Sequence, residues 1–328
     1  MKLATYSAGG QQKVGLVHSN DSQLFDLAAA AARNGGNPAF ASMLSLIDAG
    51  EAALDAARTL FDKNAGDESL SVAVAGAEIL APVPEPRQCR DGMSFPLHIL
   101  QAPRGQQKLA ARAKNDMEEL ARIEAEPLGE LPEVYRRQPI YYITNRFSVM
   151  GTNTTVKWPR YSRVMDYELE FGIITKNKGA NISAAKAKDH IFGYTIFNDF
   201  SARDAQRLEM EGRLGPAKGK SFDGGNVMGP WIVTPDEIGD PYNLKMECRV
   251  NGKMRSTGVT KGMLFSFEEI IAHVTQDETL MPGEFIGSGT VGNGCGLELG
   301  WYLEHNDEIE LEVEKIGVLK NKVVRQDV

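Results

Sequence analysis

Two glutamates separated by a single residue, Glu168 and Glu170, are the side chains whose type and spacing most directly suggest chemistry. A β-strand repeats every two residues, so both carboxylates would project from one face of a strand, with Leu169 on the other. Two anions held this close resist joint ionisation unless a cation lies between them, and a hard divalent ion with oxygen ligands meets that need. The spacing predicts a metal-binding strand, and a solvated strand face is the alternative.

A third oxygen ligand is available at Asp199. The segment 191–197 is apolar on both faces, which indicates a buried strand, and Asn198 and Asp199 follow it directly. The glutamate strand is also apolar on its other face, so both strands are expected inside a sheet rather than at its edge. The alternative for Asp199 is a helix N-cap or a turn before the segment 201–206.

The composition is that of a soluble globular protein. The chain has 328 residues, of which 42% are hydrophobic and 24% charged, and its net charge is −8. A negative charge opposes nonspecific binding to nucleic acid or to an anionic membrane, so a small-molecule partner is favoured. The sequence contains no run of about 18–20 apolar residues and no signal-peptide core near its start, so we expect a cytoplasmic protein.

Cysteine and histidine offer no metal motif. The three cysteines are far apart and odd in number, which fits a reducing compartment and excludes a disulfide framework or a thiolate zinc site. No pair among the five histidines has the spacing of a helical metal motif. Any metal site in this chain is therefore expected to be rich in oxygen.

Residues 1–80 are expected to form a small α+β unit. Strands are predicted at 2–7, 13–18 and 71–79, and alanine-rich helices at 27–33 and 40–62. The proline-spaced segment 81–86 is stiff and extended, so it is the best candidate for a connector. Residues 87–328 would then form a second, catalytic domain.

The second part of the chain is expected to be rich in β-structure. Helices are predicted at 106–126 and 266–276, and strands at 140–143, 231–234, 244–251, 285–286 and 308–314. Asn251-Gly252 between alternating runs predicts a hairpin turn. The glycine-rich segment 286–294 follows no βαβ pattern and lacks the lysine of a P-loop, so a loop that passes close to a ligand or metal is favoured over a phosphate site.

Asp91 and His98 are further candidates. If their segment were helical, a spacing of seven would place them about two turns apart, near enough to face one cavity. A hydrogen-bonded structural histidine is the alternative.

Several segments, in order and spacing, closely resemble the fumarylacetoacetate hydrolase family. They read R-D-G-M-S-F-P-L-H from residue 90, D-Y-E-L-E-F from 166, N-D-F-S-A-R-D from 198, L-G-P-A-K-G-K-S-F from 214 and G-P-W-I-V-T from 229. The resemblance extends from Pro86 to the C-terminus, and residues 1–80 resemble the family's smaller domain more loosely. It implies an α+β, mainly β fold, with a mixed β-sandwich roll as catalytic domain and a homodimer as assembly.

The resemblance also implies roles for individual residues. The ligands of a divalent cation, Mg²⁺, Mn²⁺ or Ca²⁺, would be Asp91, Glu168, Glu170 and Asp199. His98 would be the base that activates water, with an acidic partner near Glu298, a glutamate that we place at the start of a strand. The residues that hold the substrate and stabilise the departing carbanion would be Arg203, Gln206 and Lys220. Tyr142 and Thr290 correspond to positions near the substrate and the metal.

The expected function is metal-dependent hydrolysis of a carbon–carbon bond in a β-diketone or acylpyruvate-type oxo acid, in the catabolism of aromatic or sugar-derived acids. A decarboxylase, isomerase or hydratase on the same metal site is the first alternative, and a non-catalytic metal-binding scaffold is the second. The chain departs from the family between His98 and Tyr142, at Arg213-Leu214 and after Thr290. Because of these departures, the resemblance does not identify the substrate.

Overall fold

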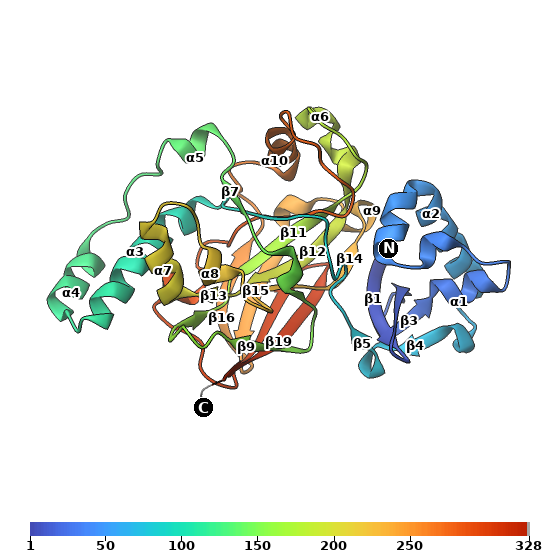
Figure 1. Ribbon diagram of the computed structural model, residues 1–328, viewed down its shortest axis with the longest axis horizontal. Helices are drawn as coiled ribbons and strands as arrows, with labels where there is room; N and C mark the ends of the chain where they lie inside the picture. Colours follow the sequence, from blue (N-terminus) through green and yellow to red (C-terminus); the bar gives the residue numbers. More distant parts are fainter. Residues whose placement is uncertain (327–328) are drawn as a thin grey trace.

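The computed structural model describes residues 1–326 and places the glutamate-bearing strand inside the larger of two main sheets (Figure 1). This strand, β11 (Leu169–Thr175), lies between β12 (Ile191–Asp199) and β17 (Phe285–Gly287) and is antiparallel to both. Every residue of β11 and β12 is buried. Apolar side chains on both faces of these strands are consistent with this interior position.

The larger sheet has twelve strands. Its order is β4 (Ser71–Ala73), β3 (Gln23–Asp26), β2 (Gln11–Val17), β1 (Lys2–Ala8), β14 (Asn226–Val233), β12, β11, β17, β6 (Cys89–Gly92) and β7 (Tyr141–Ile143), with β5 (Glu78–Ile79) on β1 and β8 (Val149–Met150) on β14. The second sheet has the order β16 (Lys253–Val259), β15 (Lys245–Val250), β18 (Glu308–Val313), β19 (Gly317–Arg325) and β9 (Thr154–Trp158). A small ladder joins β10 (Met165–Asp166) to β13 (Ser201–Ala202).

The helices surround these sheets (Figure 1). They are α1 (Leu27–Ala32), α2 (Met43–Asn64), α3 (Pro96–Ala113), α4 (Met117–Ala125), α5 (Val134–Arg137), α6 (Ala184–Ala187), α7 (Arg203–Glu211), α8 (Ala217–Lys220), α9 (Pro235–Ile238), α10 (Phe267–Val274) and α11 (Gly296–Leu299). Both sheets contain parallel and antiparallel pairs, which confirms the predicted α+β class. Among the helices of residues 1–326, none is both long and apolar enough to cross a lipid bilayer.

The N-terminal unit shares the larger sheet with the rest of the chain, because β1 pairs with β14. One apolar core joins Phe25 and Leu46 of this unit to Ile232 and Phe285 of the body. The predicted connector 81–86 lies beside this junction, where the Thr5 hydroxyl donates a hydrogen bond to the Pro82 carbonyl at 2.6 Å. The division into domains at this connector stays a prediction.

Three predicted elements differ from the structure. The expected strand 71–79 is interrupted by a 3-10 turn at Val74–Gly76. The expected helix 106–126 is two helices, because Asn115 adopts φ 54° after α3 and Asp116 caps α4 by accepting a hydrogen bond from the Glu119 amide. Residues 91–98 are not one helix, since β6 ends at Gly92 and α3 begins at Pro96.

The Asn-Gly hairpin is confirmed. β15 and β16 pair around Asn251-Gly252, whose φ values are 50° and 72°. Both values are positive, as the tight hairpin turn requires.

Candidate active site

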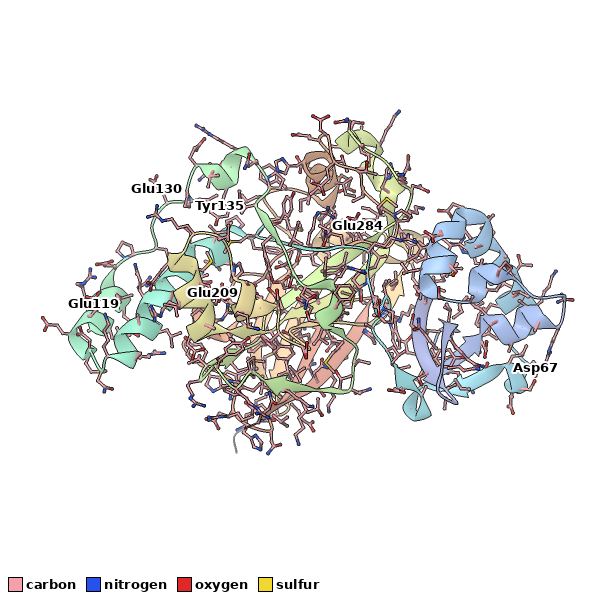
Figure 2. All side chains as sticks on the ribbon, in the orientation of Figure 1. Asp67, Glu119, Glu130, Tyr135, Glu209 and Glu284 are labelled. Atoms are coloured by element: carbon pink, nitrogen blue, oxygen red, sulfur yellow. The ribbon has the colours of Figure 1, made fainter. Side chains whose placement is uncertain are left out.

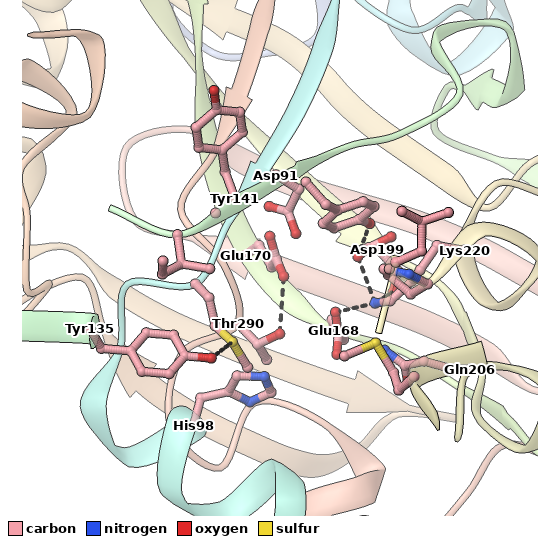
Figure 3. A pocket seen from close by; sticks show the side chains of 18 of the residues that line it. Asp91, His98, Tyr135, Tyr141, Glu168, Glu170, Asp199, Gln206, Lys220 and Thr290 are labelled. Atoms are coloured by element: carbon pink, nitrogen blue, oxygen red, sulfur yellow. Dashed lines mark hydrogen bonds and ion pairs between the residues drawn. The ribbon is translucent and has the colours of Figure 1, made fainter. Parts of the chain in front are cut away.

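Three carboxylates from three strands meet at one point of the larger sheet (Figure 3). Asp91 lies on β6, Glu170 on β11 and Asp199 at the end of β12, and each offers an oxygen that lies within 4.8 Å of the other two. Strand β17 lies between β6 and β11 in the sheet. We call these three residues the carboxylate cluster.

The carboxylate cluster fits a hard divalent cation. Asp91 Oδ1, Glu170 Oε2 and Asp199 Oδ1 are buried, and within residues 1–326 none of them has a hydrogen-bond partner. Buried anionic oxygens without partners are costly, and three of them converging on one point form the ligand set that Mg²⁺, Mn²⁺ and Ca²⁺ prefer. The donor set contains neither nitrogen nor sulfur, which does not favour zinc or copper.

A glycine creates the space for this cluster. Gly287 on β17 pairs with Asp91, and a Cβ atom at position 287 would lie 2.2 Å from Asp91 Oδ1. Gly289 has φ 77°, and a Cβ atom there would lie 2.5 Å from the Gly92 carbonyl oxygen. The glycine-rich segment therefore passes close to the candidate metal ligands, as its composition predicts.

Burial makes the cluster hard to ionise without a cation. It raises the pKa of Asp91 to about 8, and the neighbouring Asp199 carboxylate adds to this effect. It also raises the pKa of Glu170 well above its ordinary value, and that of Asp199 to about 6 despite the opposing effect of Lys220. The metal-free cluster thus retains protons in a pH range where ordinary carboxyl groups have lost them.

The stability of the metal-free protein is therefore expected to fall as the pH rises from about 5 to about 8. In this window the carboxyl groups of the cluster bind more protons in the folded protein than in the unfolded chain. A rise in pH therefore lowers the free energy of unfolding, by roughly 1–4 kcal/mol over the whole window. Urea unfolding at both pH values, with EDTA and then with Mn²⁺, measures the effect. Mn²⁺ should cancel most of the loss, and Asp91→Asn should reduce it; equal stability of the metal-free wild type at both pH values would contradict the prediction.

Glu168 lies next to the cluster but has different partners. Its carboxylate is 2.5 Å from Lys220 Nζ and 2.8 Å from Arg203 Nη2. Burial by itself would raise the pKa of Glu168, but Lys220 and Arg203 outweigh burial and lower it below its ordinary range. Of the four predicted metal ligands, Glu168 is the one that contacts two protein cations.

Lys220 connects Glu168 to the cluster. Its ammonium group lies 2.6 Å from Asp199 Oδ2, in addition to its contact with Glu168. Burial opposes the charge, but the two carboxylates raise the pKa of Lys220 above its ordinary value. Lys220 is 2% exposed and remains a cation in the lining of the cavity.

His98 and Glu298 form a hydrogen-bonded pair although 200 positions separate them. His98 Nδ1 lies 3.1 Å from Glu298 Oε1. Pro96 starts α3 and brings His98 into its first turn, while α11 carries Glu298, whose Oε2 accepts a hydrogen bond from the Cys295 amide at 3.0 Å. Glu298 was expected at the start of a strand; it lies instead in a short helix.

Asp166 is a residue to which the sequence analysis assigned no role. It is fully buried and accepts hydrogen bonds from the amides of Gly296 and Leu297, at 2.7 and 2.8 Å, and from Arg203 Nε at 2.8 Å. Burial raises the pKa of Asp166, and Arg203 opposes that rise. Asp166 therefore contacts both the start of α11, the helix that carries Glu298, and Arg203, the cation that pairs with Glu168. The sequence signal that could have identified Asp166 is its place as the first residue of the motif D-Y-E-L-E-F.

Tyr142, Thr290 and Gln206, which are also predicted to lie near the substrate, form hydrogen bonds with the charged groups of the site. The Tyr142 hydroxyl donates to Asp199 Oδ2 at 2.7 Å, and the Thr290 hydroxyl donates to Glu170 Oε1 at 3.0 Å. Gln206 Oε1 accepts a hydrogen bond from Arg203 Nη1 at 3.0 Å. These contacts fix the orientation of two cluster carboxylates and of the guanidinium group.

A cavity of about 500 Å³ opens above the cluster. Nine of the eleven predicted site residues line it, and the other two, Arg203 and Glu298, contact lining residues, Glu168 and His98 respectively. The rest of its lining consists of residues that the sequence analysis did not assign to the site: Gly92, Met93, Tyr135, Ile140, Tyr141, Met210, Arg213, Leu214, Gly215 and Pro216. Tyr135, labelled in Figure 2, lies in α5, and its hydroxyl donates a hydrogen bond to Met93 Sδ at 3.3 Å. The cavity has the size of a small-molecule site.

Comparison with known proteins adds family information. Residues 108–324 match the family model described as the C-terminal region of fumarylacetoacetate (FAA) hydrolase. A mitochondrial oxaloacetate tautomerase of Homo sapiens is 38% identical over 189 residues, which are 57% of this chain and 60% of that protein. The match thus spans less than two thirds of that relative's length.

Solved structures resemble the whole chain. A fumarylacetoacetate hydrolase from Exiguobacterium antarcticum gives a TM-score of 0.70 at 25% identity, covering 99% of this chain and 100% of that chain. A maleylpyruvate hydrolase from Sphingobium sp., in complex with manganese(II) ion and pyruvate, gives 0.69 at 19% identity, covering 99% of each chain. At 19% identity, the similarity to the maleylpyruvate hydrolase shows a shared fold only.

Proposed function

Because the chain belongs to the fumarylacetoacetate hydrolase family, we propose that it is a divalent-metal-dependent enzyme that hydrolyses a carbon–carbon bond in a β-diketone or acylpyruvate-type oxo acid. The observation that carries this proposal is the pairing of His98 with Glu298 beside a cavity that contains the carboxylate cluster. A base and a candidate metal site facing one cavity are what the attack of water on a polarised carbonyl requires.

Asp91, Glu170 and Asp199 would hold the cation, with Glu168 as the adjacent fourth carboxylate. When bound, Mg²⁺, Mn²⁺ or Ca²⁺ would act as a Lewis acid that polarises a substrate carbonyl and stabilises negative charge on its oxygen. The protein fixes this site by the Thr290 hydroxyl on Glu170 and the Tyr142 hydroxyl on Asp199.

His98 would accept the proton of the attacking water. The Glu298 carboxylate accepts a hydrogen bond from His98 Nδ1, so the proton of the neutral imidazole lies on Nδ1 and Nε2 is the basic atom. Within residues 1–326, no protein group hydrogen-bonds to Nε2. Glu298 would then stabilise the imidazolium that forms, in the way a buried carboxylate supports a catalytic histidine.

Lys220 and Arg203 would act at different distances from the reaction. Lys220 lines the cavity and would stabilise negative charge that develops on the departing fragment. Arg203 does not line the cavity; its guanidinium group contacts Glu168 and Asp166. Arg203 is therefore proposed to hold Glu168 in place and to orient Gln206, which does line the cavity.

Tautomerisation of an oxo acid is the second candidate, favoured by the 38% identity to an oxaloacetate tautomerase. The same base would then take a proton from the carbon next to the carbonyl, and no water would add to the substrate. The two candidates share the carboxylate cluster and differ in their products.

A panel of 2,4-dioxo acids and acylpyruvates, together with oxaloacetate, separates the two. With Mn²⁺-loaded protein we expect two carboxylic acid fragments from at least one 2,4-dioxo acid, measured by chromatography and mass spectrometry. Interconversion of the keto and enol forms of oxaloacetate is followed by ultraviolet absorbance in the same samples. Accelerated interconversion without cleavage of any panel member would replace the hydrolase by the tautomerase. Release of CO₂ without the formation of two carboxylic acid fragments would replace it by a decarboxylase.

A further inference from the structure

A second group of potential metal ligands is formed around Glu298. His98, Cys295 and Glu298 each offer a donor atom that lies within 4.8 Å of the other two, and the carboxylate cluster is the only other such group within residues 1–326. His98 Nδ1 is 3.1 Å from Glu298 Oε1, and Cys295 Sγ is 3.4 Å from Glu298 Oε2. We call these three residues the mixed-donor group. Sequence spacing does not show it, because 200 positions separate His98 from Glu298.

The donors of this group differ in type from those of the carboxylate cluster. An imidazole nitrogen, a thiolate sulfur and a carboxylate oxygen are the ligands that Zn²⁺ takes, whereas Mg²⁺ and Mn²⁺ prefer oxygens. In a tetrahedral zinc site, bonds of about 2.0–2.3 Å place the ligand atoms about 3.3–3.8 Å apart. The contacts of 3.1 and 3.4 Å to the carboxylate are close to this spacing. The group therefore offers three of the four positions of a tetrahedral site.

The charge of the mixed-donor group also suits a divalent cation. Cys295 and the side chain of Glu298 are fully buried, and one thiolate with one carboxylate balances the two charges of Zn²⁺. The guanidinium group of Arg203 interacts electrostatically with Cys295. Arg203 is itself paired with Asp166 and Glu168, so two carboxylates offset its positive charge.

Capping of α11 does not account for a cysteine at position 295. Cys295 is the N-cap of this helix, and its Sγ accepts a hydrogen bond from the Glu298 amide. Ser, Thr, Asp and Asn are preferred at this position, because oxygen is a stronger acceptor than sulfur. A serine would cap the helix better, whereas only a cysteine supplies a soft metal ligand.

A metal ion would reach the group from the main cavity. His98 lines that cavity (Figure 3), whereas Cys295 and Glu298 do not. Glu298 also lines a smaller cavity of about 170 Å³, but Arg104 and Lys108 in its lining oppose the entry of a cation. The His98 ring is therefore the first ligand that an entering ion meets.

We propose that the mixed-donor group is a second metal site, selective for Zn²⁺, and that its occupation inhibits the enzyme. The metal replaces the thiol proton of Cys295, which is released to solvent. When it binds His98 Nδ1, the proton of that nitrogen moves to Nε2, and the base can no longer accept a proton from water. The inhibition rests on the proposed function, because it takes His98 as the base, but the binding of the metal does not.

Cobalt(II) tests the site without turnover. In excess Mg²⁺, which suits the carboxylate cluster and binds thiolates poorly, Co²⁺ should give the near-ultraviolet charge-transfer band of a Co²⁺–thiolate bond and the visible bands of tetrahedral coordination. Zn²⁺ should displace Co²⁺ and remove both. Cys295→Ser should lack the charge-transfer band and bind Zn²⁺ at least about 100-fold more weakly. Because serine is a good N-cap, its Tm should stay within about 4 °C of the wild type.

Two variants serve as controls. Cys248→Ala removes a buried thiol that belongs to neither group of ligands, so it should keep the charge-transfer band. Glu170→Ala damages the carboxylate cluster and leaves the mixed-donor group intact, so it should keep the band as well.

Turnover tests the inhibition. With Mn²⁺ in excess, Zn²⁺ should inhibit the wild type as the mixed-donor group fills, and Cys295→Ser should need at least about 100-fold more Zn²⁺ for the same fractional inhibition. Absence of the thiolate band in the wild type, or its presence in Cys295→Ser, would overturn the site. Full turnover of wild type with Zn²⁺ in the group would overturn the inhibition. Failure of the hydrolase proposal is distinguishable, since a Cys295-dependent band in a protein that cleaves no 2,4-dioxo acid would refute hydrolysis and support the second metal site.

Discussion

Replacing His98 with alanine is expected to lower kcat about 10²- to 10⁴-fold, the range for loss of a general base. Metal binding should change little, because the cluster ligands are all oxygens and His98 is not among them. The variant leaves Glu298 Oε1 without its donor, which should cost about 1–3 kcal/mol of stability. Rates measured well below the Tm of both proteins, together with Mn²⁺ titration, separate loss of the base from loss of the fold.

Two variants refine this test. His305 is exposed and its Nδ1 accepts a hydrogen bond from the Arg325 amide, so His305→Ala should keep wild-type turnover. Glu298→Gln keeps the shape of the pair and removes its charge, and combining it with His98→Ala should lower kcat little further than His98→Ala alone. A folded, metal-binding His98→Ala protein with wild-type turnover would refute the assignment of the base.

Removal of the metal is expected to abolish activity, and Glu170→Ala should weaken metal binding by at least about 100-fold. Glu170 supplies a cluster oxygen without a protein partner, so its loss removes both a ligand and a negative charge from the cation site. EDTA should stop turnover, Mg²⁺ or Mn²⁺ should restore it, and excess Mn²⁺ should recover part of the activity of Glu170→Ala. Isothermal titration and turnover at increasing Mn²⁺ concentration provide the measurements.

Glu304→Ala is the matched control, because Glu304 is exposed and no described contact uses its carboxylate. It should bind Mn²⁺ like the wild type. Full turnover in exhaustively demetallated protein would disprove the metal-dependent mechanism. Unchanged Mn²⁺ affinity in Glu170→Ala would instead remove this residue from the ligand set and leave the mechanism standing.

The sequence by itself determined the two buried strands and the direction of the glutamate side chains. Alternation of polar and apolar residues has a period of two only in a strand, so Glu168 and Glu170 had to share a face opposite Leu169 and Phe171, which are now found in the core. A local pattern was sufficient because side-chain alternation follows from backbone geometry. The oxygen-rich character of the site followed likewise from the absence of histidine and cysteine motifs.

Tertiary structure alone decided which charges meet. Glu168 and Glu170 are equivalent in the pattern, yet Lys220, 52 positions away, neutralises Glu168 and leaves Glu170 without a cation. Glu298 lies in a helix because the buried carboxylate of Asp166 accepts hydrogen bonds from the first two amides of that helix, those of Gly296 and Leu297, which are 130 and 131 positions away from Asp166. Intrinsic propensity cannot stabilise a helix of four residues.

The cation that lines the cavity was equally beyond the sequence. Thirty-six lysines and arginines occur in the chain, and composition cannot tell which of them lies beside the carboxylates of a cavity. The structure places Lys220 there, between Glu168 and Asp199. Long-range pairing is set by packing of the whole chain, because the contacts of each ionisable group come from segments that only the fold brings together.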